Sequence, residues 1–264
     1  MPQLNAGKGV KGKRQTFHPL SFPSRSLIIR NVFQVIPCVD IQKGKAVRLL
    51  EGDPNKETVY FESPLEAAKH WADLGAKWLH LVDLDAALGE GDNAALIAEI
   101  AEAVDARVEL GGGVRSFEAA KTWLKSVDRV VLGTAAVKQP SLVDELLERY
   151  GEERVVVSVD AKDGFVAVRG WKELSRTRSV DLARRVAEQG VTQLIYTDIT
   201  RDGTLQGVNP EPVAAVRDVF PDTLLAGGGV ATDGDIELYE SLGLDGAIVG
   251  RALYEGTVTY PRTT

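Results

Sequence analysis

Short apolar runs alternate with amphipathic stretches along the chain from residue 32 onward. Such runs are typical of buried parallel strands, which are hydrophobic on both faces because helices cover both sides. They lie at residues 35–39, 78–82, 107–110, 129–132, 155–159, 193–196, 223–226 and 246–249. Eight strand–helix units in about 230 residues predict an α/β fold of the (β/α)8 TIM barrel type. An open doubly wound sheet is the competing fold, but it usually has fewer strands in this length.

The amphipathic stretches begin at residues that favour helix starts, with capping side chains or Pro in the first turn. The predicted starts are Ser63-Pro64, Ser116 and Pro140-Ser141, with others near Ser179, Pro210 and Thr232. The eighth helix is the exception, because Pro261 cannot sit inside a helix. We therefore expect either a very short last helix or a truncated chain, and a missing helix would expose apolar barrel surface.

The chain repeats itself at an interval of nearly constant length. Residues 111–114 recur 116 positions later (227 − 111), and Val39-Asp40 recurs 120 positions later at Val159-Asp160 (160 − 40). Residues 131–135 and 83–85 also recur, at 248–252 and 198–200. These matches predict a barrel of two half-barrels with four units each. Equivalent loops then face each other across the barrel mouth, which suits a substrate charged at both ends.

Composition excludes several classes of protein. The chain has 264 residues, of which 44% are hydrophobic, enough for one large domain with a sizeable core. No apolar run is long enough to span a membrane. The net charge of −7 argues against nucleic-acid binding. One cysteine, Cys38, and three histidines make disulfides and a metal centre unexpected, so we expect no metal.

Charge is unevenly distributed. Residues 1–31 contain six basic and no acidic residues, so the remainder has 25 basic (31 − 6) against 38 acidic residues. We expect residues 1–31 to be a basic, disordered extension and residues 32–264 to be the barrel domain. The extension lacks the apolar core of a secretory signal, which favours a cytoplasmic protein. An organelle transit peptide is the less favoured alternative.

Two aspartates end predicted strands at equivalent positions of the repeat. Asp40 ends the first strand and Asp160 the fifth, so both lie at the barrel end where such folds place active sites. Two carboxylates can act as general acid and general base if their surroundings differ. The alternative is that each braces a loop or caps a helix. Thr197, at the end of the sixth strand, is the third catalytic candidate, or else a turn residue.

Glycine-rich turns follow the third and seventh strands, and a second glycine turn follows the fourth and eighth. Glycine allows backbone N–H groups to close around a phosphate. The candidate phosphate-binding residues are Gly112, Gly113, Gly133 and Thr134 in one half, and Gly228, Gly229, Gly250 and Arg251 in the other. Because this pair of turns occurs twice, we predict two phosphate-binding sites.

Further candidates lie in the loops around the mouth. Arg48, on a short strand after Asp40, can meet an anion, and Asp202-Gly203 forms a turn after Thr197. Arg169 and Trp171 can form a lid in which the indole stacks on a flat ring, although core packing is the alternative for Trp171.

Other residues carry simpler interpretations. We expect Cys38 to be a buried structural thiol and His80 to be packed in the core. No Gly-x-Gly-x-x-Gly stands at a strand–helix turn, so no dinucleotide cofactor is indicated.

Specific strings extend through most of the chain: residues 36–40 (IPCVD), 47–49 (VRL), 79–86 (LHLVDLDA), 109–113 (ELGGG), 170–171 (GW), 197–199 (TDI) and 202–207 (DGTLQG). On these strings, residues 35–255 resemble the histidine-biosynthesis isomerases that act on phosphoribosylformimino-5-aminoimidazole carboxamide ribotide. The resemblance implies an aldose–ketose isomerase that performs an Amadori rearrangement without a cofactor. It also implies that Asp40 accepts the proton at C2 of the ribose, that Asp160 donates the proton that opens the ring, and that Thr197 supports them.

The expected ligand is a doubly phosphorylated small molecule, with no nucleic-acid or membrane partner, and the expected state is a monomer. Three alternatives stay open. A bifunctional isomerase would also convert phosphoribosylanthranilate, although it usually has Ser where this chain has Gly111. The cyclase of the same pathway shares the repeat and the first aspartate. A non-catalytic phosphosugar-binding protein would use the same fold.

Overall fold

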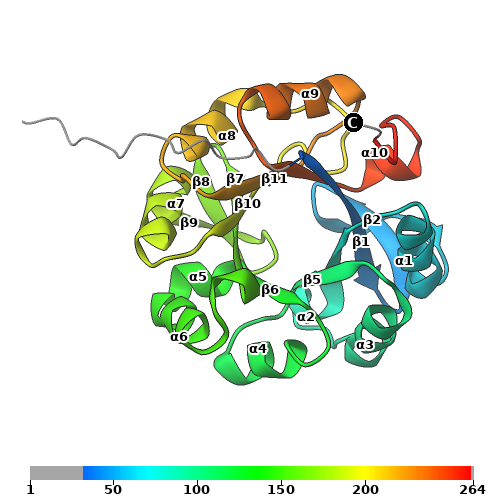
Figure 1. Ribbon diagram of the computed structural model, residues 1–264, viewed down its shortest axis with the longest axis horizontal. Coiled ribbons are helices and arrows are strands. Elements are labelled where there is room, and N and C mark those ends of the chain that lie inside the picture. The colour runs from blue at the N-terminus through cyan, green and yellow to red at the C-terminus, as the bar shows by residue number, and fades with distance from the viewer. Residues whose placement is uncertain (1–31, 263–264) are drawn as a thin grey trace, which may run out of the picture. The chain divides into compact units, whose positions relative to one another are not determined.

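The computed structural model describes residues 32–262, which form a closed ring of parallel strands surrounded by helices (Figure 1). The ring strands are β1 (Gln34–Gln42), β4 (Trp78–Asp83), β5 (Arg107–Gly111), β6 (Arg129–Leu132), β7 (Val155–Lys162), β10 (Gln193–Asp198), β11 (Thr223–Gly227) and β12 (Gly246–Val249). Neighbouring strands follow chain order, and the pairing of β7 with β10 completes the ring. The predicted (β/α)8 barrel is confirmed and the open sheet is excluded. The extension predicted for residues 1–31 lies outside the described residues.

Helices surround the ring (Figure 1). They are α1 (Pro64–Asp73), α2 (Leu84–Leu88), α3 (Ala94–Ala103), α4 (Phe117–Trp123), α5 (Thr134–Lys138), α6 (Pro140–Tyr150), α7 (Ser179–Glu188), α8 (Pro210–Arg217), α9 (Asp233–Ser241) and α10 (Arg251–Tyr254), with a 3-10 turn η1 (Glu152–Arg154). The longer helices cover the outer face of the ring, while residues of the short helices α2, α5 and α10 border the mouth. The predicted starts are confirmed: the Ser63 and Ser116 side chains cap α1 and α4, and Thr232 forms a capping box at α9. Within residues 32–262, no helix is long and apolar enough to cross a membrane.

Two hairpins extend the ring at equivalent places in the repeat. β2 (Lys45–Leu50) and β3 (Asp53–Phe61) follow β1, while β8 (Phe165–Val168) and β9 (Glu173–Arg178) follow β7. The first turn of each has the same backbone form, with Lys43 and Asp163 at φ 49° and 52°, each followed by a glycine. The repeat therefore includes the hairpins, of which we predicted only β2, the short strand that carries Arg48.

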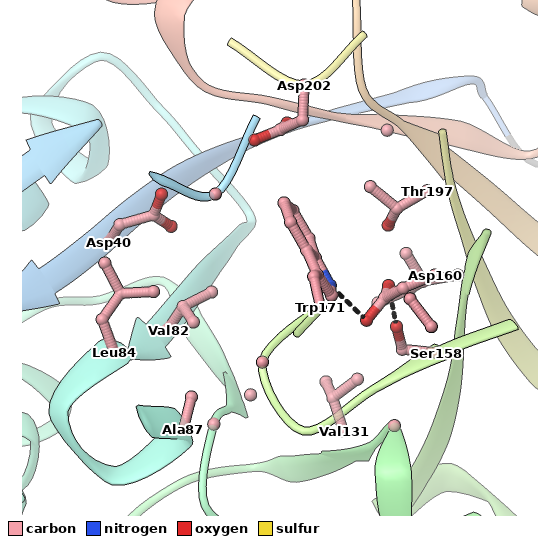
Figure 2. A pocket seen from close by; sticks show the side chains of 18 of the residues that line it. Asp40, Val82, Leu84, Ala87, Val131, Ser158, Asp160, Trp171, Thr197 and Asp202 are labelled. Carbon is pink, nitrogen blue, oxygen red and sulfur yellow. Dashed lines mark hydrogen bonds between the residues drawn. The ribbon is translucent and has the colours of Figure 1, made fainter. Parts of the chain in front are cut away.

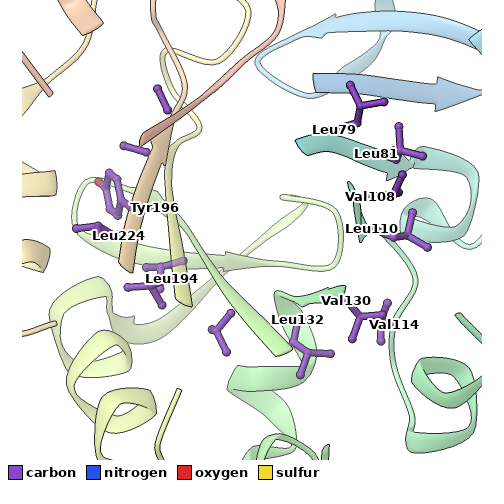
Figure 3. Packing of buried hydrophobic residues seen from close by; sticks show 14 of the residues in the cluster. Leu79, Leu81, Val108, Leu110, Val114, Val130, Leu132, Leu194, Tyr196 and Leu224 are labelled. Atoms are coloured by element: carbon purple, nitrogen blue, oxygen red, sulfur yellow. The ribbon is translucent and has the colours of Figure 1, made fainter. Parts of the chain in front are cut away.

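Strand alternation divides the apolar core into two parts, because successive side chains point to opposite faces of the sheet. The larger part lies between the ring and the helices and includes the outward side chains drawn in Figure 3, among them Leu79, Leu81, Val108, Leu110, Val130 and Leu132. The smaller part fills the ring interior with Ile36, Val131, Val156, Ile195 and Leu225. The inward positions nearest the carboxyl ends of the strands remain available for polar residues.

A buried polar chain shares the ring interior. His80 Nδ1 lies 2.6 Å from Oε1 of Glu109, and Oε2 of Glu109 accepts a hydrogen bond of 2.7 Å from Nε of Arg129. Burial acts to raise the pKa of Glu109, but the charge of Arg129 and the hydrogen bond with His80 outweigh it and lower the pKa. The Arg129 guanidinium lies 3.8 Å from the ring centre of Trp78. His80 is therefore buried, as predicted, and paired.

The last helix, α10, has four residues, as expected from Pro261. Aromatic packing covers the wall beside it. The ring of Tyr254 stacks on Tyr60 at 4.7 Å and meets Trp71 of α1 edge-on at 5.3 Å, and Trp71 also contacts Tyr260. Val258, in the segment after α10, is buried. The short helix therefore does not leave the apolar surface exposed that we expected from a missing helix.

Close backbone contacts explain the repeated glycines after β5 and β11. A Cβ atom on Gly112 would lie 2.2 Å from the carbonyl oxygen of Asp83, and one on Gly228 would lie 2.3 Å from that of Asp198. Both glycines have positive φ, at +92° and +87°. Only glycine fits at these positions, and the loops are held against the neighbouring strand ends.

We predict that Gly112→Ala destabilises the protein much more than Gly75→Ala. The two positions have nearly the same φ, +92° and +93°, but a Cβ atom on Gly75 meets nothing within 4 Å. Gly75→Ala should cost about 1–2 kcal/mol from the left-handed backbone alone. Gly112→Ala should cost about 1–3 kcal/mol more from the overlap. Urea unfolding followed by circular dichroism measures both, and equal losses would contradict the explanation.

Candidate active site

A pocket of about 680 Å³ lies at the carboxyl ends of the ring strands. Every residue that the sequence singled out for catalysis or phosphate binding lines this pocket. The strands position these residues, because loops that leave the same edge of a parallel sheet converge. The structure therefore brings all the candidates together, while their roles remain predictions.

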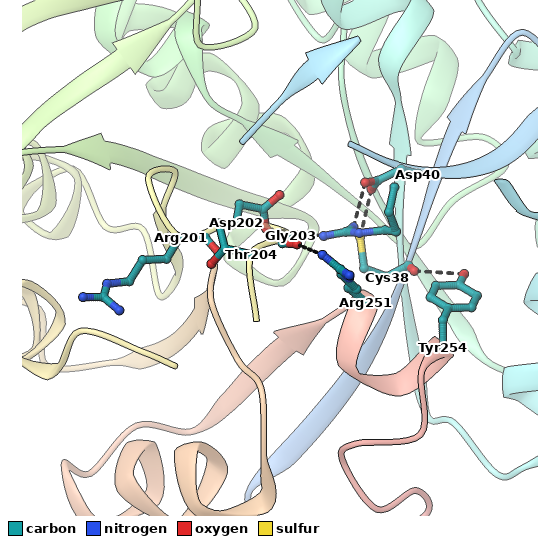
Figure 4. A network of polar contacts seen from close by, with 9 residues as sticks. Cys38, Asp40, Arg201, Asp202, Gly203, Thr204, Arg251 and Tyr254 are labelled. Carbon is teal, nitrogen blue, oxygen red and sulfur yellow. Dashed lines mark hydrogen bonds and ion pairs between the residues drawn. The ribbon is translucent and has the colours of Figure 1, made fainter. Parts of the chain in front are cut away.

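Asp40 is 9% exposed and accepts two hydrogen bonds, one on each carboxylate oxygen. Its Oδ2 lies 2.6 Å from Nη1 of Arg48, and its Oδ1 lies 3.0 Å from Sγ of Cys38 (Figure 4). Arg48 reaches Asp40 because β2 pairs antiparallel with β1 and brings residue 47 opposite residue 40. Cys38 lies on the same face of β1, two residues earlier. The expected burial of Cys38 is confirmed.

Arg48 bridges two carboxylates. Its Nη2 lies 3.3 Å from Oδ1 of Asp202, which is in the loop after β10. Burial acts to lower the pKa of Arg48, but the charges of Asp40 and Asp202 dominate and raise it. A Cβ atom on Gly250 would lie 2.4 Å from Cζ of Arg48, so this glycine makes room for the guanidinium. Contact of Arg48 with a substrate anion remains a prediction.

Asp160 lies across the pocket from Asp40, and the indole of Trp171 projects between them (Figure 2). Asp160 Oδ2 accepts a hydrogen bond of 2.9 Å from Nε1 of Trp171, and Oδ1 accepts one from the Ser158 hydroxyl. Trp171 lies between β8 and β9 at φ +65°. A Cβ atom on Gly52 would lie 2.5 Å from the indole, so the β2–β3 turn also accommodates the ring.

The two aspartates have equivalent positions but different partners. The repeat that relates Asp40 to Asp160 relates Arg48 to Val168, since both pairs are 120 residues apart (160 − 40, 168 − 48). Arg48 thus provides a positive charge at Asp40. Within residues 32–262, Asp160 is hydrogen-bonded by neutral groups and forms no ion pair. A general acid and a general base require different electrostatic surroundings, and the two aspartates have them.

The second glycine turns also match in conformation. Gly133 precedes α5 at φ −95° and ψ −94°, and Gly250 precedes α10 at φ −106° and ψ −96°. Thr134 Oγ1 accepts a hydrogen bond from the backbone N–H of Arg169 at 2.8 Å. Nη1 of Arg251 donates to the carbonyl oxygen of Gly203 at 2.7 Å. One turn is therefore hydrogen-bonded to the segment that carries Arg169 and Trp171, and the other to the loop that carries Asp202.

Three basic residues in the pocket wall were missed by the sequence analysis: Arg115, Lys138 and Lys172. Arg115 is two residues after Gly113 and Lys172 is next to Trp171, so their closeness to a motif could have pointed to them. Their charges make this side of the mouth attractive to anions. No group of three His, Cys, Asp or Glu side chains in the described part of the chain is arranged to hold a metal ion.

A closed (β/α)8 barrel with two facing carboxylates and two glycine-rich turns at the mouth is typical of barrel enzymes that act on anionic substrates. A family model described as "Histidine biosynthesis protein" matches residues 34–259, and the chain belongs to this family. The relatives are named 1-(5-phosphoribosyl)-5-((5-phosphoribosylamino)methylideneamino)imidazole-4-carboxamide isomerase. That of Deinococcus radiodurans is 56% identical over 86% of this chain and 96% of the relative. That of Thermus thermophilus is 47% identical over 85% and 96%.

The raised pKa of Asp202 leads us to predict how the stability of the protein depends on pH. Burial raises the pKa of Asp202 from 3.8 to about 6; Arg48 opposes this rise, and Asp40 and Asp160 add to it. Between these pH values the folded state binds more protons than the unfolded state, so the free energy of unfolding falls as pH rises. Asp202→Asn should remove about 2–3 kcal/mol of that fall.

Urea titrations between pH 3.5 and 7 measure this effect, with the exposed Asp105→Asn as the matched control. The Asp105 variant should follow the wild type. An Asp202 variant whose stability falls as steeply as that of the wild type would contradict the assignment.

Proposed function

We propose that this protein is the isomerase of histidine biosynthesis that converts N'-(5'-phosphoribosylformimino)-5-aminoimidazole-4-carboxamide ribonucleotide from the aminoaldose to the aminoketose form. The names of the relatives support this substrate. The observation that carries the proposal is the placement of Asp40 and Asp160 on opposite sides of one pocket, with a cation at Asp40 alone. An Amadori rearrangement needs both an acid and a base at adjacent ribose atoms.

The reaction begins at the ribose ring. Protonated Asp160 donates its proton to the ring oxygen, which breaks the bond between C1 and that oxygen as the nitrogen lone pair forms a protonated imine at C1. Asp40, ionised beside Arg48, then removes the proton from C2 to form an enaminol. Proton return to C1 and loss of the hydroxyl proton at C2 give the ketose. Hydrogen moves only within the substrate and the two carboxyl groups, so the conversion requires no redox cofactor.

Thr197 supports the acid. It lies on β10 opposite Asp160 of β7 in the parallel register, and both side chains line the pocket. Its hydroxyl can hold the oxygen that Asp160 protonates, which keeps the acid in contact with the reacting bond. Trp171 presents its ring to the same space and can stack on the flat imidazole of the substrate.

The two glycine turn pairs bind the two phosphates. Gly112 and Gly113 act with Gly133 and Thr134 at one end of the substrate, and their counterparts act at the other. The second set includes Arg251, while Arg115 and Lys138 lie beside the first. Anchoring at both ends holds the ribose between the aspartates. Three expectations remain predictions: that the reaction needs no cofactor, that the protein is a monomer and that it is cytoplasmic.

We predict that Asp40→Asn and Asp160→Asn each lower kcat by at least about 100-fold, the usual contribution of a positioned acid or base. Each variant keeps the shape of the side chain, so circular dichroism should stay close to that of the wild type. Asp40→Asn, which removes the ion pair with buried Arg48, should lower the unfolding temperature more than Asp160→Asn. Asp105→Asn is the control and should turn over normally. Wild-type rates in either site variant, measured with the ribotide, would contradict the assigned roles.

We also predict that removing either phosphate from the substrate lowers kcat/KM by at least about 100-fold, or 2.7 kcal/mol. Each phosphate occupies its own turn pair, so neither loss can be compensated by the other. Kinetics with the two mono-dephosphorylated analogues measure the loss at each end. An analogue as good as the full substrate would show that only one turn pair binds phosphate.

A further inference from the structure

Each aspartate of the pocket has a hydrogen-bond donor two residues before it on its own strand. Cys38 precedes Asp40 on β1, and Ser158 precedes Asp160 on β7. The two donors are 120 residues apart (158 − 38), the interval that separates the two aspartates. Because side chains two residues apart point to the same face of a strand, both donors face the ring interior with their aspartates. Neither donor has a role in the reaction described above.

The two pairs share the same pattern of contacts to the carboxylate, although Cys38 Sγ also accepts a hydrogen bond of 3.3 Å from Nη1 of Arg48. The Cys38 thiol contacts Oδ1 of Asp40 at 3.0 Å, and the Ser158 hydroxyl donates to Oδ1 of Asp160. In each pair the other oxygen, Oδ2, is held from the hairpin that follows the strand, by Arg48 at Asp40 and by Trp171 at Asp160. Both carboxylates are therefore held at both oxygens.

The thiol is a donor in this environment. Cys38 is 4% exposed, and burial followed by the charge of Asp40 raises the pKa of its thiol well above the usual value. The group therefore keeps its proton and can share it with Oδ1. Ser158 is also buried, at 9% exposed. Removal of either donor takes away the hydrogen bond that holds Oδ1 of its carboxylate.

We propose that Cys38 and Ser158 are a repeat-related pair of positioning residues, each of which fixes the rotation of a reacting carboxylate through its Oδ1. This inference rests on the proposed function, since it assigns Asp40 and Asp160 their roles. With rotation fixed, each carboxylate keeps its unused lone pairs directed at the substrate. The weaker donor, the thiol, stands where Arg48 already holds the carboxylate, and the stronger hydroxyl stands where the cation is missing.

The test compares variants of the full chain that lack the donor with variants that keep it. Cys38→Ala and Ser158→Ala should each lower kcat by about 10–100-fold, the range expected when a hydrogen bond to a charged group is lost. KM should change less than twofold, because neither residue belongs to the glycine turns proposed to bind the phosphates. Cys38→Ser and Ser158→Cys, which restore a donor, should recover most of the lost kcat. Ser241→Ala, an exposed hydroxyl on α9, is the control.

Folding is checked separately by circular dichroism and thermal unfolding. If Cys38→Ala does not fold, Cys38→Val, which refills the space without a donor, takes its place and should show the same loss of kcat. Folded donor-less variants with wild-type kcat, or donor-restoring variants no better than alanine, would overturn this inference alone. A wild-type protein without turnover would instead overturn the proposed function.

Discussion

The alternation of side chains along closed parallel strands is the constraint on which the site depends. On β1, the inward positions from the interior to the mouth are Ile36, Cys38 and Asp40. On β7 they are Val156, Ser158 and Asp160. An apolar floor, a donor and a carboxylate therefore stand in the same order on both strands. A shift of one residue in either register would turn all three outward.

The repeated scaffold has one departure from its symmetry beside the two aspartates. Arg48 and Val168 occupy equivalent positions of the hairpins that follow β1 and β7. The arginine places a positive charge between Asp40 and Asp202, while Asp160 keeps neutral donors. The single exchange therefore gives two equivalent carboxylates different electrostatic surroundings.

Much of the fold could be predicted from the sequence because its signals are local. Apolar runs marked the eight ring strands, capping residues such as Ser63 marked the helix starts, and the repeat interval placed both aspartates at one end of the barrel. Because the active site of such a barrel lies at the carboxyl ends of the strands, the strand ends and the loops after them also placed every candidate residue in the pocket.

What the sequence did not predict depends on long-range contacts or on backbone geometry. The contact of Arg48 with Asp202 joins residues 154 positions apart. The polar edge strand Glu173–Arg178 carries no apolar run, and its hairpin was missed. Trp171 itself has positive φ in the turn before that strand, a backbone form that the sequence does not reveal. From this turn its indole reaches Asp160. The donors Cys38 and Ser158 were visible only as residues two positions before each aspartate.

The measurement that tests the central claim most directly is turnover of the formimino ribotide by the purified chain of 264 residues. The substrate is compared with and without deuterium at C2 of the ribose under single-turnover conditions. The account predicts conversion to the aminoketose, slower with deuterium, because Asp40 removes that hydrogen. A folded protein that leaves the ribotide unchanged would contradict the account, and conversion of phosphoribosylanthranilate in the same assay would extend it to a second substrate.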